Sequence, residues 1–493
     1  MGPSPFPCTL RINLGVAHSN ANDTNANEQE LGRPHSTYNA GWSQGRARCS
    51  DRKESMHADL VSASTCQAPI RRLRWWIGGL LFLSTVINYL DRQTLSVLAP
   101  FLKDEYKWTN TDFATVLISF RVAYTIFQSV SGRVVDKLGT RRGLSLSVAF
   151  YSSIAALTAL AQGIAGFRIF RFLLGVGEAA NWPGATKAVS EWFPARERGW
   201  AVALFDSGSS IGGAIAPFLV LYLHHTFGSW RPAFLITGLL GFFWLLAWRA
   251  LYQTPEKHPR LSPEELDYIR EGRAPQPPTS AALPATPWSR LLRYRQTWGI
   301  MLGRFLLDPY WYLVAEWFAL YLLSRGFRLE QSVLGFWAPF LGADLGNFCG
   351  GALSSYWIAK GWPVGRARRM VLGVFGPSML LLIAAAFVSN YLLLILLFAW
   401  ASFAYGACST MFLALPADVF HTRAVASVSG LSGTAAGVGT LISTFMIGVV
   451  TDKFSFQPVV IVASILPCVA TLLLVTMVRS PKRPDPDEVL TEF

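Results

Sequence analysis

The strongest constraint on this chain is a series of apolar runs, each about 20 residues long, that recurs from residue 76 onward. A helix rises about 1.5 Å per residue, so each run can cross the roughly 30 Å hydrocarbon core of a bilayer. The composition agrees, because 52% of the 493 residues are hydrophobic and only 15% are charged, unlike a soluble domain. The sequence therefore predicts an all-α membrane protein with twelve spans, centred on Trp76–Leu98, Phe113–Gly132, Leu144–Gln162, Phe167–Val189, Ala201–Leu223, Phe234–Leu251, Trp298–Leu323, Val333–Ile358, Met370–Val388, Tyr391–Leu415, Val425–Val450 and Val459–Met477.

The distribution of basic residues predicts how these spans are oriented. The net charge of +13 could indicate a nucleic-acid partner, but Lys and Arg gather mainly in alternate short connections. Such a bias is typical of the cytoplasmic connections of a membrane protein. We therefore predict a chain embedded in lipid, with both termini cytoplasmic and no nucleic-acid partner. The cations of the even-numbered connections are Arg133, Lys137, Arg141, Arg142, Arg196, Arg198, Lys360, Arg366, Arg368, Arg369 and Arg423.

Polar segments flank and divide the apolar runs. Residues 1–70 are rich in Ser, Asn and Thr and are predicted to be a disordered leader, and their place in the native protein stays open. Residues 253–296 are rich in proline and predict a cytoplasmic linker, in which Ser262 and Pro263 can begin a short amphipathic helix. The predicted domains are then the leader, a six-helix bundle at 71–252, the linker, a second six-helix bundle at 297–480 and a cytoplasmic tail at 481–493.

Two matches indicate that the halves are repeats. Leu90-Asp91 in the first span has a counterpart, Leu307-Asp308, in the seventh. The segment 193–213 resembles the segment 420–439 in its spacing of Arg, Ser and Gly. The small residues of these fifth and eleventh spans would allow close helix contact. Many secondary transporters are built from two such repeats with a substrate site between them, so the pattern predicts transport by rocking of the two halves.

The connection between the second and third spans combines glycines, an acid and bases. It contains Gly132, Asp136, Lys137, Gly139, Arg141 and Arg142, and it resembles the motif of the major facilitator superfamily. Asp136 could pair with a nearby cation or cap a helix N-terminus, forming a cytoplasmic latch that breaks during transport. The alternative is an ordinary basic loop. In the second half Ser355 stands in place of the acid, so a weaker latch is expected there.

Ionisable residues inside the spans are the main clue to function. Asp91 and Arg92 lie deep in the first span, where an unpaired charge costs several kcal/mol. Arg171 and Glu178 are two turns apart on one face of the fourth span, and Arg121 lies in the second. Three arginines against two clear acids predict a cavity that attracts a carboxylate. The alternative is a set of internal salt bridges, and Arg121 could also reach an interface.

Further side chains would add hydroxyls or aromatic faces to this cavity. An aromatic pair follows Pro309, which is predicted to break the seventh span, and these rings could stack on a sugar or belong to the interfacial belt. Ser209 has a mainly structural interpretation. Asp344 and Asn347 could complete the site instead. The four candidates are Tyr124, Ser209, Trp311 and Tyr312.

The segments 88–92, 171–179 and 192–194 carry a closer resemblance. Over residues 71–480 the chain resembles the anion:cation symporter family of that superfamily, whose members carry organic anions. The segment 308–311 and parts of the later spans look like the bacterial hexuronate transporters. The resemblance implies substrate and coupling arginines (Arg92, Arg171), protonatable acids (Asp91, Glu178) and cavity hydroxyls (Tyr89, Tyr124). Arg121, Glu316 and His421 depart from the family pattern, which leaves the substrate open.

The expected function is proton-coupled import of a sugar-acid anion, such as galacturonate or glucuronate, across the inner membrane of a bacterium by a functional monomer. No phosphate-binding, zinc-protease or nucleophile-elbow motif occurs, so we expect no enzyme and no cofactor. The six cysteines have no metal or redox spacing. Two alternatives stay open: a symporter for an aldonate, aldarate or aromatic acid, and a membrane sensor that does not transport.

Overall fold

The computed structural model describes residues 69–271, 285–327, 333–479 and 489–491, which belong to one compact unit, Gln67–Phe493. The predicted leader up to residue 68, linker residues 272–284 and most of the predicted tail lie outside the described residues. Regular structure in the described part is helical, apart from an isolated bridge between Phe420 and Leu490. The helices are α2 (Leu73–Tyr106), α3 (Asn110–Leu138), α4 (Thr140–Leu157), α5 (Gly163–Glu178), α6 (Asn181–Trp192), α7 (Ala195–Phe227), α8 (Arg231–Leu251), α9 (Pro263–Arg270), α10 (Trp288–Leu291), α11 (Arg295–Tyr312), α12 (Phe318–Ser324), α13 (Val333–Ala359), α14 (Val364–Ser378), α15 (Tyr391–Val419), α16 (Val425–Lys453) and α17 (Phe456–Met477).

Nine helices of the described part are long and apolar enough to cross a membrane, and the protein is a multi-pass membrane protein. Three of the twelve predicted spans are not among these nine, so the number twelve stays a prediction. They are Phe167–Val189, Trp298–Leu323 and Val333–Ile358. The first two are interrupted, and the third corresponds to α13, which packs against α7 and α15.

A proline explains the first interruption. α5 ends at Glu178, and α6 begins at Asn181 with Pro183 in its first turn. Because proline has no N–H and its ring collides with the carbonyl four residues earlier, it fits the first turn of a helix but not the interior. The break leaves Glu178 at the end of one helix and Trp182 at the start of the next, and both side chains take part in the site described below.

The second interruption does not lie at Pro309, where the sequence predicts it. α11 continues through Pro309 to Tyr312 and is followed by a π-helical turn, η4 (Leu313–Trp317). The prediction of a break at the proline is therefore wrong by a few residues. Single π-helical turns inside α-helices are frequent at functional sites. Here the turn carries Glu316, which forms an ion pair with Arg121 of α3.

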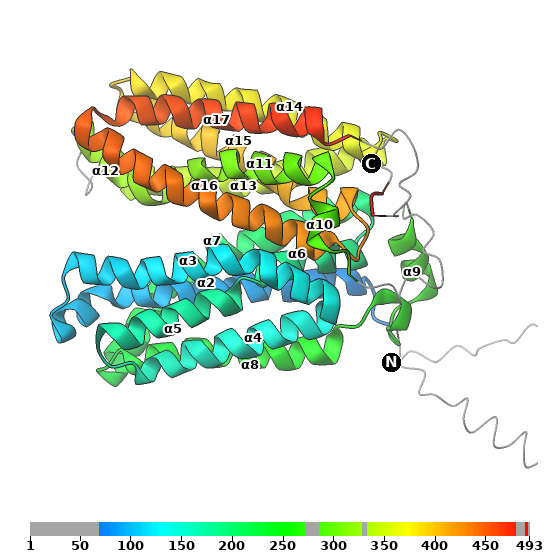
Figure 1. Cartoon of the computed structure of the whole chain (residues 1–493), viewed down its shortest axis with the longest axis horizontal. Coiled ribbons are helices and arrows are strands. Elements are labelled where there is room, and N and C mark those ends of the chain that lie inside the picture. Colours follow the sequence, from blue (N-terminus) through cyan, green and yellow to red (C-terminus); the bar gives the residue numbers. More distant parts are fainter. Residues whose placement is uncertain (1–68, 272–284, 328–332, 480–488, 492–493) are drawn as a thin grey trace, which may run out of the picture. The chain divides into compact units, whose positions relative to one another are not determined.

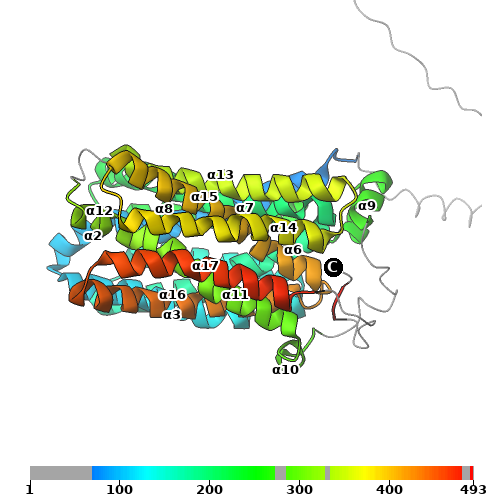
Figure 2. The same ribbon diagram turned by 90° about the horizontal axis from the view of Figure 1, so that it is seen from above.

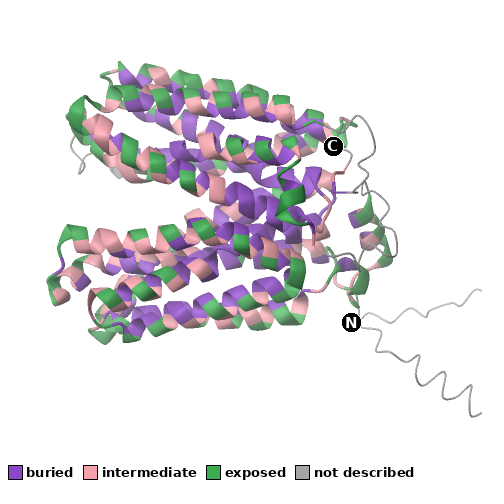
Figure 3. Cartoon of the chain, viewed as in Figure 1, coloured by how far each residue is buried: buried purple, intermediate pink, exposed green. Residues whose placement is uncertain are grey.

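The membrane helices form two bundles that pack side by side, one from α2 to α8 and one from α11 to α17 (Figure 1). Seen from above, helices of the two bundles overlap (Figure 2). Each bundle has its own apolar core, which includes Tyr151 and Phe205 in the first bundle and Phe398 and Met411 in the second. The bundles meet along α3 with α16 and along α7 with α13. Figure 3 shows that buried residues gather between the bundles toward the end that lies near α9.

Glycines allow this close meeting of the two halves. Gly132 of α3 lies against the carbonyl of Ala426, and Gly430 of α16 lies against that of Gln128, so that a Cβ at either position would collide with backbone. Close backbone approach of this kind is the use that membrane proteins make of small residues. The small residues of the eleventh predicted span therefore lie between the halves.

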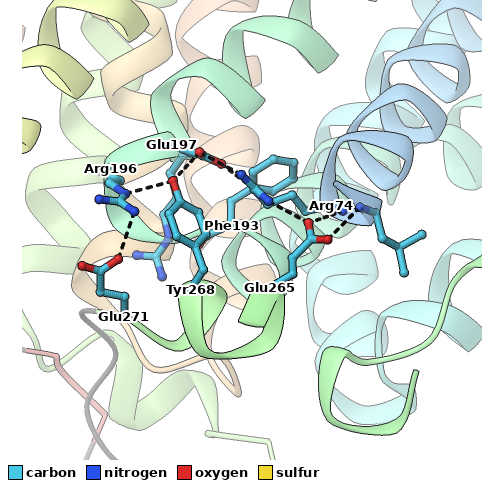
Figure 4. Close-up of polar contacts among 9 residues, drawn as sticks. Arg74, Phe193, Arg196, Glu197, Glu265, Tyr268 and Glu271 are labelled. Carbon is cyan, nitrogen blue, oxygen red and sulfur yellow. Dashed lines mark hydrogen bonds and ion pairs between the residues drawn. The ribbon is translucent and has the colours of Figure 1, made fainter. Parts of the chain in front are cut away.

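The linker helix α9 is fastened to the first bundle through Glu265 (Figure 4). Ser262 caps α9, since its hydroxyl accepts a hydrogen bond from the backbone N–H of Glu265. The Glu265 carboxylate in turn accepts hydrogen bonds from the backbone N–H groups of Leu73 and Arg74 at the start of α2. It also pairs with the Arg74 guanidinium at 2.7 Å. An acid at a helix N-terminus satisfies free N–H groups and the helix dipole.

Tyr268 forms a second attachment of α9. Its ring is contacted by the guanidinium groups of Arg74 and Arg196, whose central carbons lie 4.5 and 4.2 Å from the ring centre. Its hydroxyl donates a hydrogen bond to Glu197 at the start of α7. Burial and this hydrogen bond raise the pKa of Tyr268, so the hydroxyl keeps its proton as a donor. Helix α9 thus ties together the first turns of α2 and α7.

Glu265→Ala is expected to lower the free energy of unfolding by about 1–2 kcal/mol, because two backbone donors and one guanidinium lose their acceptor. The measurement is the midpoint of thermal unfolding of the purified protein in detergent. Glu264→Ala is the matched control, since Glu264 precedes Glu265 on the same helix and is exposed. Equal midpoints for the two variants would show that the contact with α2 contributes nothing measurable.

Candidate functional site

A cavity of about 390 Å³ lies between the two bundles and is lined by helices of both. All eight side chains that the sequence predicts to bind substrate line it: Tyr89, Arg92, Arg121, Tyr124, Arg171, Ser209, Trp311 and Tyr312. Its volume is at the lower end of the range for small-molecule sites. The repeats therefore bring residues from distant parts of the chain to one enclosed space.

Arg92 lies in a cage of aromatic rings. The central carbon of its guanidinium is 4.4 Å from the ring centre of Tyr124, 5.1 Å from that of Tyr89 and 5.6 Å from that of Trp182. Its Nε donates a hydrogen bond of 2.6 Å to Glu178. Its Nη2 has no hydrogen-bond partner among the described residues. A flat guanidinium held by rings and one carboxylate is well placed to bind a second carboxylate.

Arg171 and the two acids of the first bundle lie around Arg92. The Arg171 Nη2 donates to the backbone carbonyl of Arg92 at 3.3 Å. Glu178 is fully buried and Asp91 is 2% exposed, and neither is among the residues that line the cavity. Asp91 is close to the hydroxyl of Thr237. The acids therefore lie behind the arginines as seen from the cavity.

Arg121 lines the cavity. It forms an ion pair with Glu316 of the other bundle, and its guanidinium lies 5.4 Å from the ring centre of Tyr312. Of the three cavity arginines, Arg92 and Arg121 are therefore already paired with an acid. Arg168, one turn before Arg171, instead donates a hydrogen bond to the hydroxyl of Thr115 and is not among the lining residues.

The sequence analysis missed Asp206 of α7, which also lines the cavity. Its carboxylate accepts hydrogen bonds from the indole N–H of Trp182 at 3.2 Å and from the amide of Asn347 at 3.3 Å. The count of two clear acids in the first half was therefore wrong. The same signal that pointed to Asp91, an acid inside an apolar run, was available at Asp206.

The second bundle adds more polar groups to the cavity wall. Arg304 and Asp308 of α11 form an ion pair of 2.5 Å. Asp344 of α13 accepts a hydrogen bond of 2.8 Å from the hydroxyl of Ser210. The neighbouring Ser209 hydroxyl donates to the backbone carbonyl of Asp206. In the described part of the chain no group of three or more His, Cys, Asp or Glu side chains is arranged to hold a metal ion.

Asp136 joins the bundles at the end that carries the basic connections. Its carboxylate pairs with Lys187 of α6 at 2.8 Å and accepts hydrogen bonds from the backbone N–H groups of Ala426 and Ser427, at the start of α16. Asp136 thus pairs with a cation of its own bundle and caps a helix N-terminus of the other bundle. Its cation is the buried Lys187, which the sequence analysis did not single out.

The other residues of this motif have different places. Gly132 lies at the contact with α16, and Gly139 has φ of 78°, which allows the tight turn between α3 and α4. Lys137, Arg141 and Arg142 are exposed. Arg141 donates a hydrogen bond to the carbonyl of Arg249 at the end of α8.

A second polar connection joins the halves through Asp418. Ser355 replaces the acid, but Asp418 of α15 pairs with Arg198 of α7 and with Arg368 of α14, each at 2.9 Å. Arg368 also donates to the carbonyl of Ala195. Arg198 and Arg368, which the sequence assigns to the basic connections, are therefore buried links between the halves.

Comparisons with known proteins agree with this architecture. The family model described as Major Facilitator Superfamily matches residues 81–444 and 364–491. The chain is 35% identical over 421 residues to the hexuronate transporter of Escherichia coli strain K12, covering 83% of this chain and 95% of that protein. It is 40% identical over 285 residues to the galacturonate transporter of Dickeya chrysanthemi, covering 57% and 81%.

A solved structure supports the fold independently of close sequence similarity. The human organic anion transporter MFSD10 superposes with a TM-score of 0.61 at 17% identity, covering 81% of this chain and 99% of that one. This likeness shows the arrangement of helices alone. The two bundles, the cavity between them and the match over most of the sequence lead to one conclusion, namely that the chain belongs to the major facilitator superfamily and resembles the bacterial hexuronate transporters.

Proposed function

We propose that this protein is a proton-coupled symporter that imports a sugar-acid anion, a hexuronate such as galacturonate or glucuronate. The observation that carries the proposal is the group of three arginines and several aromatic rings on the wall of one cavity between the bundles. Arginine binds carboxylates through paired hydrogen bonds, and aromatic rings suit the apolar face of a sugar. The names of the relatives point to the same substrate class.

In this mechanism the substrate carboxylate docks on Arg92 and Arg171. Arg92 is already paired with Glu178, so an incoming carboxylate competes with Glu178 for the guanidinium. A proton on Glu178 removes that competition. Asp91 has two enclosed carboxyl oxygens that accept no hydrogen bond of normal geometry among the described residues, and we assign it the second proton. Protonation of both acids and substrate binding thus favour each other, which is what coupling requires.

Alternating access would follow from rocking of the bundles. The contacts of Asp136 and of Asp418 close the end with the basic connections, which we take as cytoplasmic. We therefore interpret the arrangement as facing outward, with both termini cytoplasmic, in the inner membrane of a bacterium. Substrate and protons enter from outside, the contacts break, and both leave to the cytoplasm. The transporter works as a monomer, since one chain supplies both halves of the cavity.

The test is uptake of radiolabelled galacturonate by proteoliposomes under an inward proton gradient. Arg92→Ala is expected to lower uptake at least about a hundredfold, because an ionic hydrogen bond to a carboxylate is worth about 1.5–3 kcal/mol and Glu178 loses its partner as well. Arg168→Ala is the matched control, since it removes an arginine of the same bundle that pairs with a hydroxyl outside the cavity wall.

Three outcomes would change the proposal. If the protein accumulates an aldonate, an aldarate or an aromatic acid and not a hexuronate, the substrate class is wrong. If accumulation of galacturonate ignores the proton gradient, the coupling is wrong. If the folded protein binds an organic anion but moves none, the sensor function replaces the transporter.

A further inference from the structure

The cavity has an acidic wall opposite in charge to the arginines. Asp206 of α7, Asp308 of α11 and Asp344 of α13 all line it. Arg304 pairs with Asp308 and offsets one of these three acids. The mechanism proposed above uses none of them.

Trp182 separates this wall from Arg92. One face of its indole lies 5.6 Å from the central carbon of the Arg92 guanidinium, while its ring N–H donates to Asp206 at 3.2 Å. Arg92 and Asp206 are thus one indole ring apart. A ligand whose carboxylate lies on Arg92 therefore extends past Trp182 toward the acids.

The acids keep free acceptor positions. Asp308 is buried, and its Oδ1 has no hydrogen-bond partner among the described residues while its Oδ2 pairs with Arg304. Asp344 receives a hydrogen bond from Ser210 on Oδ1. A carboxylate can accept about four hydrogen bonds, and a buried oxygen without a donor is costly unless a ligand supplies one. The wall is thus suited to a ligand rich in donors.

We propose that Asp206, Asp308 and Asp344 form a hydroxyl-recognising wall that restricts the transporter to anions with a single carboxylate. The inference rests on the proposed function and narrows its substrate class to hydroxylated monocarboxylates. Sugar hydroxyls donate hydrogen bonds to the acids, which strengthens binding because hydrogen bonds to charged groups are the stronger kind. Arg304 is already paired with Asp308, so a second carboxylate at the same place would meet the like charges of Asp206 and Asp344, and this repulsion disfavours binding.

The probe pair is galacturonate and galactarate, in which a second carboxylate replaces the aldehyde carbon that closes the galacturonate ring. Galactonate, an open-chain anion with one carboxylate, controls for the loss of the ring. Affinities are measured by thermal shift and by competition against galacturonate uptake, with the full-length protein. We expect the wild-type protein to bind galacturonate at least roughly tenfold more tightly than galactarate, which corresponds to about 1.4 kcal/mol. Equal binding of the two compounds by the wild-type protein overturns the proposal.

Asp344→Asn removes one charge from the wall and keeps the size of the side chain. The substitution is expected to weaken the binding of galacturonate several-fold and to strengthen the binding of galactarate. The ratio of the two affinities should therefore fall at least roughly tenfold. Ser210→Ala is the matched control, because it removes the hydroxyl partner of Asp344 and leaves the charge, so the ratio should change little. Asp206→Asn provides a second test of the same kind.

The outcomes separate this inference from the proposed function. Uptake of both probes with equal affinity leaves organic-anion transport standing and removes the role of the acidic wall. Binding of galactarate alone overturns both, and binding of neither probe by folded protein overturns the hexuronate assignment together with this inference. An unchanged affinity ratio in Asp344→Asn and in Asp206→Asn also overturns the role of the wall.

Discussion

Glu178→Gln is expected to abolish accumulation of galacturonate against a gradient while exchange of labelled for unlabelled substrate continues. Glutamine keeps the size of the side chain and accepts a hydrogen bond from Arg92, as Glu178 does at 2.6 Å. It cannot bind or release a proton. The cavity should therefore still bind substrate and open to either side, but the proton gradient should no longer drive import. We expect gradient-driven uptake to fall at least about a hundredfold, as for loss of a required proton carrier, whereas exchange changes only several-fold.

Glu316→Gln is the matched control for this variant. Glu316 is also an acid paired with a cavity arginine, Arg121, but it lies on the other bundle and its side chain is 25% exposed. It should keep accumulation driven by the proton gradient. Accumulation that survives in Glu178→Gln would remove Glu178 from the coupling mechanism, and loss of exchange as well would indicate a role in binding or folding.

The parts of the fold that sequence predicted are those that depend on single helices. Runs of apolar residues give the spans, because a bilayer requires length and apolarity of each helix separately. Charged residues such as Arg92 and Arg171 were found for the same reason, since their cost in lipid is a property of their own helix. Trp311 and Tyr312 also line the cavity, although their spacing alone fitted the interfacial belt equally well.

The parts that sequence missed are pairs between helices. Nothing near Asp136 in the sequence shows that its cation is Lys187, 51 positions later, or that it caps α16 in the other half. Arg198 and Arg368 resemble loop cations in the sequence because they lie near helix ends. Only the packing of the helices shows that both are buried and paired with Asp418. Asp206 was missed for another reason. It is followed at once by serines and glycines, a pattern that is typical of close helix packing.

Asp136→Asn is expected to shift the protein toward an arrangement open to the cytoplasm. The carboxylate of Asp136 is fully buried and accepts hydrogen bonds from the N–H groups of Ala426 and Ser427 in the other bundle, and a hydrogen bond to a charged group is worth about 1.5–3 kcal/mol. The two hydrogen bonds to α16 exist only while the two halves are closed at this end, whereas the pair with Lys187 lies within the first bundle. Loss of the two hydrogen bonds therefore destabilises the closed arrangement specifically. Transport should fall at least about tenfold, because the outward-facing arrangement becomes rare.

Access from the cytoplasmic side measures this shift. A cysteine in place of Ser429, a buried residue of α16 whose hydroxyl donates to Thr186 in the other bundle, should react with a maleimide added from that side roughly ten times faster in Asp136→Asn than with Asp136 present. Asp104→Asn is the control, because Asp104 is an exposed acid near the end of α2. Unchanged reactivity together with lost transport would mean that Asp136 acts on folding rather than as a latch. Faster reactivity in both variants would point to a general loosening, whereas faster reactivity in Asp136→Asn alone identifies the cap of α16 by Asp136 as a contact that holds the halves closed at the end with the basic connections.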